Sequence, residues 1–328
     1  MNHFFCRNAL AVVAACSFAF GTAPSRAADY PSKPISIVVG YPAGGSVDFT
    51  ARAFGEALSQ RLGQSVIIEN VGGAGGTIGA NKVARAAANG YTLLVGSTNE
   101  MVIAGMINSA VRYDGLKDFT PIGMIAAQPM MLATAKGSDV TNAAQYLKKL
   151  RSGGRGDYTF GSSGVGTALH LAGEMINAST QTHAEHIPYR GVAPLLTDLV
   201  SGQLDYGVFV MSSGLPQVKS GKIVALGVTE ARRSPAAPDI PALAETPGFE
   251  KVDINVWFGL YGPAGLPDDV VAVLRKALDE VLKQDEFRKR LAASGATLYA
   301  PGMDAKAFQA AETLKYASLV EMAKIKRQ

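Results

Sequence analysis

The stretch that most constrains the fold is residues 35–62, where a β-branched run, a glycine-rich turn and an amphipathic pattern follow one another. Residues 35–39 read Ile-Ser-Ile-Val-Val, which is typical of a strand buried in a parallel sheet. After the turn at 40–46, apolar residues recur at helical spacing up to Leu62, and Gly63 is suited to end the helix. Such a unit directs unpaired N–H groups and the positive end of a helix dipole to one place. We therefore predict an anion-binding site at this turn.

Residues 1–27 are typical of a secretory signal that is removed from the mature protein. Arg7 supplies the positive start, and residues 9–21 form an apolar segment too short to span a bilayer. Small residues precede Ala28, which we expect to begin the mature chain in the periplasm. The residues before Cys16 loosely resemble a lipobox, so a lipid anchor at Cys16 is the alternative, although the apolar run continues past it.

Both cysteines of the chain, Cys6 and Cys16, lie in this signal segment. The mature protein is therefore expected to lack disulfides, thiolate nucleophiles and zinc–thiolate sites. Removing the signal also removes Arg7 and Arg26, which leaves 29 basic residues against 27 acidic ones. A charge so close to zero gives no electrostatic reason to expect nucleic acid or an anionic membrane as a partner.

Strands and helices alternate at short spacing along the chain. Further strands are predicted at residues 65–70 and 91–96, and a second glycine turn lies at 72–79. This alternation is typical of a doubly wound α/β domain, in which ligands bind beyond the carboxyl ends of the strands. The two glycine turns and Ser97-Thr98 all lie at such ends.

A second α/β set follows, and two extended apolar segments at residues 122–135 and 254–262 separate it from the first. It includes predicted helices at 143–150, 168–176 and 193–200, strands at 158–161, 206–210 and 224–229, and a turn at 162–167 that repeats the opening arrangement. A proline-rich passage at 234–247 is too broken for regular structure, and two amphipathic helices, 267–284 and 305–323, end the chain.

We therefore predict two doubly wound α/β domains joined by two crossing strands, with domain 1 discontinuous. Domain 1 comprises residues 28–127 and 254–328, and domain 2 comprises residues 128–253. A cleft between such lobes is a favoured ligand site, and the paired crossings would act as a hinge.

Short motifs follow one another in a fixed order along the chain. They are Tyr41-Pro42-Ala43-Gly44-Gly45 with Asp48 and Arg52, Gly73-Ala74-Gly75-Gly76, Gly90-Tyr91-Thr92-Leu93, Ser163-Gly164-Val165-Gly166-Thr167 with His170 and Glu174, Pro188-Tyr189-Arg190-Gly191, Gly202-Gln203-Leu204-Asp205, Trp257-Phe258-Gly259-Leu260 and Gly262-Pro263-Ala264-Gly265. This ordered series resembles the substrate-binding receptors of tripartite tricarboxylate transporters, also called the Bug family, over essentially the whole mature chain.

This resemblance implies a periplasmic solute-binding receptor of the type II binding-protein fold, which closes over a small carboxylate and passes it to membrane permease subunits. The ligand classes that remain open are dicarboxylates, tricarboxylates, acidic amino acids and aromatic acids. We expect a monomer without a cofactor. The alternative function is a ligand-sensing receptor for a membrane signalling kinase, and sequence does not separate the two.

The predicted ligand contacts come from two glycine turns, one in each lobe, and from nearby strand ends. Backbone N–H groups at residues 44–46 and 164–167 are each expected to receive a carboxylate. The full predicted set is Tyr41, Ala43, Gly44, Gly45, Ser46, Asp48, Gly76, Thr77, Ser97, Thr98, Ser162, Ser163, Gly164, Gly166, Thr167, His170, Tyr189, Gly191 and Asp205.

Structural roles compete with ligand contact at several of these positions. The hydroxyls at strand ends are also suited to cap helices or turns, and the tyrosines to pack. Asp48 and Asp205 either face the ligand or satisfy their own backbone. Arg190 either pairs with a carboxylate or lies on the surface.

Metal-binding and catalytic functions are not supported by the motifs. His170 and Glu174 are four residues apart, and His183 and His186 three apart, but neither pair has a third ligand nearby in the sequence. The glycine runs match neither a phosphate loop nor a dinucleotide fingerprint, and Val165 replaces the second glycine of a nucleophile elbow. We therefore predict a binding protein rather than an enzyme, although an enzyme acting on small organic acids is the less favoured alternative.

Overall fold

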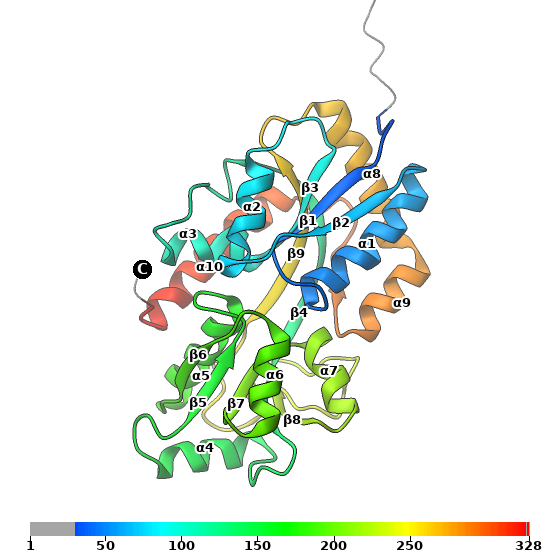
Figure 1. Ribbon diagram of the computed structural model, residues 1–328. Helices are drawn as coiled ribbons and strands as arrows, with labels where there is room; N and C mark the ends of the chain where they lie inside the picture. Colours follow the sequence, from blue (N-terminus) through cyan, green and yellow to red (C-terminus); the bar gives the residue numbers. More distant parts are fainter. Residues whose placement is uncertain (1–29, 326, 328) are drawn as a thin grey trace, which may run out of the picture.

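Two α/β lobes share a continuous sheet in this computed structural model, which describes residues 30–325 and 327. The strand order is β2-β1-β3-β9-β4-β7-β5-β6, with β8 and β10 also paired to β4. In Figure 1 the lobe with β1 to β3 lies above the lobe with β5 to β8. The strands are β1 (Ile35–Val39), β2 (Val66–Asn70), β3 (Thr92–Ser97), β4 (Phe119–Ala135), β5 (Thr159–Ser162), β6 (Glu185–Pro188), β7 (Tyr206–Val210), β8 (Ile223–Val228), β9 (Asn255–Pro263) and β10 (Thr297–Leu298).

Helices cover both faces of the sheet. The longer ones are α1 (Ser46–Leu62), α2 (Thr77–Ala84), α4 (Ala143–Ser152), α5 (Ala168–Thr180), α6 (Val192–Ser201), α7 (Met211–Lys219), α8 (Asp268–Lys283), α9 (Asp285–Ala293) and α10 (Ala305–Met322). Shorter ones are the 3-10 turns η1 (Ala74–Gly76) and η3 (Leu243–Glu245), the π-helical turn η2 (Asn99–Ile103) and α3 (Ala104–Ile107). Within the described residues, no helix is long and apolar enough to cross a membrane.

Strand β4 belongs to both lobes and forms the first crossing between them. Its first part, up to Pro129, pairs antiparallel with β9. From Met130 onward it pairs with β7 and β8 of the other lobe instead. Nearly all of its 17 residues are buried, which explains the almost continuous apolar run in the sequence. Figure 1 shows this strand passing from one lobe to the other.

In addition to the pairing of β9 with β4, the buried residue Thr229, which directly follows β8, bonds both to β4 and to the residue before β9. Its N–H donates to the carbonyl of Met130 at 2.9 Å, and the Met130 N–H donates to its Oγ1 at 3.0 Å. The same hydroxyl donates to the carbonyl of Ile254 at 2.7 Å. Thr229 therefore joins the two connections at the point where the lobes meet. We propose lobe boundaries near residues 127 and 254 because the pairing of β4 changes beside this point.

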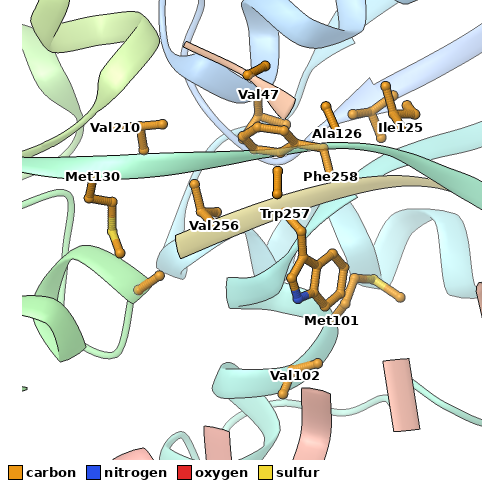
Figure 2. Packing of buried hydrophobic residues seen from close by; sticks show 14 of the residues in the cluster. Val47, Met101, Val102, Ile125, Ala126, Met130, Val210, Val256, Trp257 and Phe258 are labelled. Atoms are coloured by element: carbon orange, nitrogen blue, oxygen red, sulfur yellow. The ribbon is translucent and has the colours of Figure 1, made fainter. Parts of the chain in front are cut away.

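The core continues through the crossing region along β9. Trp257 and Phe258 are both fully buried and point to opposite sides of the strand. Figure 2 shows Phe258 on the side of Val47 and Trp257 on the side of Met101. Fully burying a large apolar side chain contributes roughly 1.5–3 kcal/mol, so this pair fixes the strand between helices on both faces. The indole N–H of Trp257 donates to Glu312 Oε2 of α10 at 3.0 Å, which satisfies its one polar atom.

The structure confirms the two-lobed α/β fold and most predicted elements to within a few residues. Gly63 ends α1 with a left-handed φ of 63°, as predicted. The helices α7 and α9 and the helical segment 99–107 were not predicted. Helix α7 begins directly after Val210, the last residue of β7, and contains Pro216, so its sequence lacks both a loop and a regular helical pattern. The predicted signal with Cys6 and Cys16 lies outside the described residues.

Candidate functional site between the lobes

Two neighbouring cavities of about 340 and 810 Å³ lie between the lobes. Both are lined by Tyr41, Pro42, Ser163, Arg190 and Gly191, so they form one cleft with residues from each lobe on its walls. Among the described residues that line them, Arg190 is the only one with a charged side chain. The cleft therefore offers neutral and backbone groups rather than a ring of charges.

The first glycine turn presents free backbone donors to the smaller cavity. The N–H groups of Gly45, Ser46 and Val47 have no acceptor in the described part of the chain, and all three residues line this cavity. They open α1, whose N-cap residue Gly45 supplies no side-chain acceptor. The dipole of a helix of 17 residues adds positive potential at the same place. An anion is the ligand that such a group of donors binds best.

Asp48 holds this turn from inside and is directed away from the cavities. Its carboxylate accepts hydrogen bonds from the Gly44 N–H, from Arg52 Nε and from Asn70 Nδ2, each at 2.9 Å. Burial opposes its ionisation, but hydrogen bonds from these three partners outweigh it and lower the pKa of Asp48. We therefore remove Asp48 from the predicted ligand contacts. The Gly44 N–H, which was a predicted donor to the ligand, is already used by Asp48.

Most amides of the glycine turn at residues 162–167, called the second turn from here on, are used within the protein. The Gly164 N–H donates to Ser162 Oγ at 3.2 Å, and the Gly166 N–H donates to His170 Nδ1 at 3.0 Å. The Thr167 N–H makes a long bond of 3.4 Å to the Gly164 carbonyl. Of the amides at 164–167 that are predicted to receive a carboxylate, three are thus engaged within the protein, and that of Val165 has no acceptor in the described chain. The N–H groups of the nearby Ser163 and Leu169 also have no acceptor there, and all three residues line the cleft.

Asn99 bridges the cleft and was not predicted from the sequence. It belongs to the lobe of β3, yet its Oδ1 accepts the N–H of Ala168, the first residue of α5 in the other lobe, at 2.5 Å. Its Nδ2 donates to the Tyr41 hydroxyl at 2.8 Å. The carboxamide oxygen therefore occupies the position at the α5 N-terminus where an anion would be favoured. A polar residue directly after Ser97-Thr98 at a strand end was the available signal.

The lobes also make an apolar contact beside the cleft. A Cβ atom at Gly166 would lie 1.7 Å from Cδ1 of Ile107 in the opposite lobe. Gly166 also has a φ of +73°, which favours glycine on backbone grounds alone. Gly166 therefore lets the second turn approach the first lobe, rather than contacting a ligand itself.

Glu100 is a buried carboxyl group beneath the cleft. It accepts hydrogen bonds from the Ser97 N–H and Oγ, each at 2.6 Å, and the Tyr41 hydroxyl lies 3.0 Å from its Oε2. Burial raises the pKa of Glu100 to about 7, although the bonds from Ser97 favour its ionised form. Burial and the nearby Glu100 charge together raise the pKa of Tyr41. The Tyr41 hydroxyl donates to the Gly75 carbonyl at 2.7 Å and so positions the glycine turn at residues 72–79.

Several predicted side chains have structural partners instead of facing the cleft. The hydroxyl of Thr98 accepts the Trp257 N–H at 2.9 Å, and that of Thr77 donates to the Ala74 carbonyl at 2.9 Å. Ser162 Oγ lies 2.7 Å from Nε2 of His186. The ring of His186 stacks on that of His170 at 3.8 Å, and burial together with the neighbouring His170 lowers the pKa of His186 to about 3.

Asp205 lines neither cavity and bonds to a neighbouring strand instead. Its Oδ2 accepts hydrogen bonds from the N–H and Oγ1 of Thr159 at 2.9 and 2.8 Å, which joins β7 to β5. Tyr189 does line the larger cavity, and its hydroxyl donates to Asp198 Oδ2 at 2.9 Å. Within the described residues, no group of three or more metal-ligating side chains is present.

The predicted residues thus divide into two sets by position. Those that line the cleft are Tyr41, Ala43, Gly44, Gly45, Ser46, Gly76, Ser97, Ser163, Gly164, Tyr189 and Gly191. Those that do not, and that we remove from the candidate site, are Asp48, Thr77, Thr98, Ser162, Gly166, Thr167, His170 and Asp205.

The chain is similar to known proteins in sequence and in structure. Residues 50–324 match the model of the tripartite tricarboxylate transporter family receptor. The chain is 30% identical to Protein BugT from Bordetella pertussis, over 91% of each sequence. It is similar in structure to the periplasmic binding protein BugD, with a TM-score of 0.85 and 31% identity over 91% of this chain and all of that one.

Two further structures with bound ligands are similar. One is Rpa4515 from R. palustris with adipate, with a TM-score of 0.86 and 29% identity over 90% of this chain and 99% of that one. The other is MatC from Rhodopseudomonas palustris with bound malate, with a TM-score of 0.81 and 28% identity over 90% of this chain and all of that one.

Proposed function

Because the chain belongs to the tripartite tricarboxylate transporter receptors, a family of periplasmic solute-binding proteins, we propose that it captures a small carboxylate between its lobes. The observation that carries this proposal is the set of three N–H groups at Gly45, Ser46 and Val47, which line the cleft and have no acceptor among residues 30–325 and 327. On the opposite wall, the N–H groups of Ser163 and Leu169 also have no acceptor in this part of the chain.

The available donors are sufficient for useful affinity. A hydrogen bond to a charged group contributes roughly 1.5–3 kcal/mol, and a helix N-terminus adds about 0.3–1 kcal/mol. Micromolar binding requires about 8.2 kcal/mol after the losses of association. Three bonds to α1 amides with one or two from the second turn supply roughly 6–15 kcal/mol before those losses, so bonds near the strong end of this range reach micromolar affinity. Arg190, at the rim of both cavities, adds a cation without being required.

The ligands of related structures support the same chemical class. Adipate and malate are both small dicarboxylates, and they are bound by proteins of the same fold. We propose for this chain a carboxylate with one acid group on the α1 turn. Membrane permease subunits are the proposed partners, a monomer the proposed state, and the predicted signal at residues 1–27 the proposed route to the periplasm.

The mechanism follows from the contacts between the lobes. An open form samples closure about the crossings at Thr229, and a bound carboxylate stabilises the closed form by touching both walls. The family consists of solute-binding receptors rather than enzymes. In keeping with this, we propose that the ligand is released chemically unchanged.

A thermal-shift screen with mono-, di- and tricarboxylates tests this function. A ligand that binds only the folded state raises the melting temperature. Gly45→Val is the informative variant, because Gly45 has a φ of −82° and a Cβ there meets only the Pro42 carbonyl at 3.7 Å. Gly105→Val is the matched control, because a Cβ at Gly105 meets nothing within 4 Å and the residue does not line the cleft.

We expect at least one acid to raise the melting temperature of the wild type and of Gly105→Val, but not of Gly45→Val. A screen without any stabilising acid would overturn the proposed function. An equal shift in Gly45→Val would show that the α1 turn is not the carboxylate site.

A further inference from the structure

Helix α7 presents a polar face to the smaller cavity that neither the sequence prediction nor the proposed carboxylate site uses. Ser213 and Gln217 are four residues apart on this helix, and both line the cavity. They face it together with Val210, the residue before the helix, and Val256 of β9. Figure 2 shows Val210 and Val256 beside the region where β4 and β9 run together.

The hydroxyl of Ser213 is an unexplained buried polar group. Ser213 is only 7% exposed, and its Oγ has no hydrogen-bond partner among the described residues. Leaving such a group unsatisfied costs about 1–3 kcal/mol, so buried hydroxyls are normally paired. Because Ser213 lines a cavity that is open to ligand, a ligand atom is a suitable partner. It lies in the first turn of α7, whose N-cap makes no side-chain bond, so the local potential favours an oxygen acceptor.

The walls between α7 and the α1 turn are largely apolar. Leu169, Val192, Pro194 and Leu196 line the same cavity, and no described acidic or lysine side chain does so. A ligand that reaches from the α1 amides to α7 therefore passes apolar surface along its middle. This pattern of donor, apolar wall and donor specifies two polar ends on an apolar body.

We propose that Ser213, supported by Gln217, forms a second polar subsite that selects acids carrying an oxygen acceptor at the end remote from the bound carboxylate. The acceptor is a second carboxylate or a carbonyl group, and the segment between the two ends is apolar. This inference rests on the proposed function, because the first carboxylate lies on the α1 turn. Ser213 then determines specificity, whereas the α1 amides determine affinity for carboxylates in general.

A matched control is available one residue away. The hydroxyl of Ser212 is also buried without a partner in the described chain, but Ser212 lines neither cleft cavity. Its N–H donates to Gln128 Oε1 at 3.3 Å, which alanine preserves. Ser212→Ala therefore makes the same chemical change in the same helix turn as Ser213→Ala.

Calorimetric titration of the wild type and both variants tests the subsite. The probes are linear dicarboxylates from succinate to suberate, each compared with the monocarboxylate of the same chain length and with the corresponding ω-hydroxy acid. We expect Ser213→Ala to weaken the best dicarboxylate about tenfold, the loss of one hydrogen bond to a charged group. We expect the matched monocarboxylate, and every probe with Ser212→Ala, to keep its affinity. An ω-hydroxy acid that binds the wild type as tightly as the matching dicarboxylate would contradict the requirement for a carboxylate or carbonyl acceptor.

The outcomes separate the two proposals. If acids bind but Ser213→Ala changes dicarboxylate and monocarboxylate affinity by the same factor, or changes neither, the subsite is overturned and the carboxylate function stands. If no acid binds the wild type, both are overturned.

Discussion

The buried carboxyl of Glu100 gives a prediction whose size follows from the structure. Burial raises its pKa from an ordinary value of 4.5 to about 7. In the folded protein Glu100 therefore holds its proton to higher pH than in the unfolded chain. As pH rises from about 4.5 to about 7, the unfolded chain ionises first and is stabilised relative to the folded protein. The contribution of Glu100 is thus fully present below its unfolded pKa and is lost as pH rises through its folded pKa.

The magnitude comes from the pKa difference. A shift of one pKa unit corresponds to about 1.36 kcal/mol, so a difference between 4.5 and about 7 is worth about 3 kcal/mol. Glu100→Gln removes this titration while keeping a side-chain oxygen that can accept from the Ser97 N–H. We expect the free energy of unfolding of the wild type, measured relative to Glu100→Gln, to fall by about 3 kcal/mol between about pH 4 and pH 8.

Urea unfolding of both proteins across this pH range is the assay. Subtracting the two curves removes the other titrating groups, because they are common to both proteins. A difference that stays constant with pH would mean that the hydrogen bonds from Ser97 offset burial, so that the pKa of Glu100 is the same in the folded and unfolded states. A difference that grows in favour of the wild type as pH rises would mean that these bonds outweigh burial and lower that pKa. Either result would contradict the raised pKa of Glu100.

Two further changes test the contacts between the lobes. Gly166→Ala is expected to weaken ligand binding about tenfold, because its Cβ would lie 1.7 Å from Ile107 Cδ1 and overpacking costs roughly 1–3 kcal/mol. Gly156→Ala has a similar positive φ but open space around its Cβ, so it should keep the affinity, whereas adding Ile107→Ala to Gly166→Ala should restore it. Calorimetry in which the double variant binds no better than Gly166→Ala would contradict this explanation. Thr229→Val is expected to lower the free energy of unfolding in urea by about 1–3 kcal/mol, because the Met130 N–H loses its acceptor; an unchanged midpoint would contradict it.

Sequence patterns predicted the parts of this protein that depend on local chemistry. The β-branched run before the first glycine turn forms β1, and the turn opens α1 with amides at Gly45 and Ser46 that have no acceptor among the residues that the structure describes. Gly63 ends that helix, as its position indicated. These features follow from backbone preferences within a few residues, so one sequence is enough to predict them.

Patterns failed where the deciding partner is distant in the sequence or where two roles suit one residue. Asn99 and Ala168 meet across the cleft with 68 residues between them, and no local motif indicates that pairing. The sequence leaves Asp48 two roles, at its own turn or at a ligand, and the positions of Arg52 and Asn70 decide between them. Ser213 was not predicted from the sequence, because Pro216 interrupts the helical pattern of the segment that forms α7.

Peptide amides of the α1 turn are the proposed carboxylate site. This assignment can be tested at single amides by titrating ¹⁵N-labelled protein with the acid that gives the largest thermal shift and following the amide resonances. We predict that the amide protons of Gly45, Ser46 and Val47 move downfield as the acid saturates the protein, as expected for donors to a carboxylate. Saturation by the acid with these three resonances unmoved would contradict it.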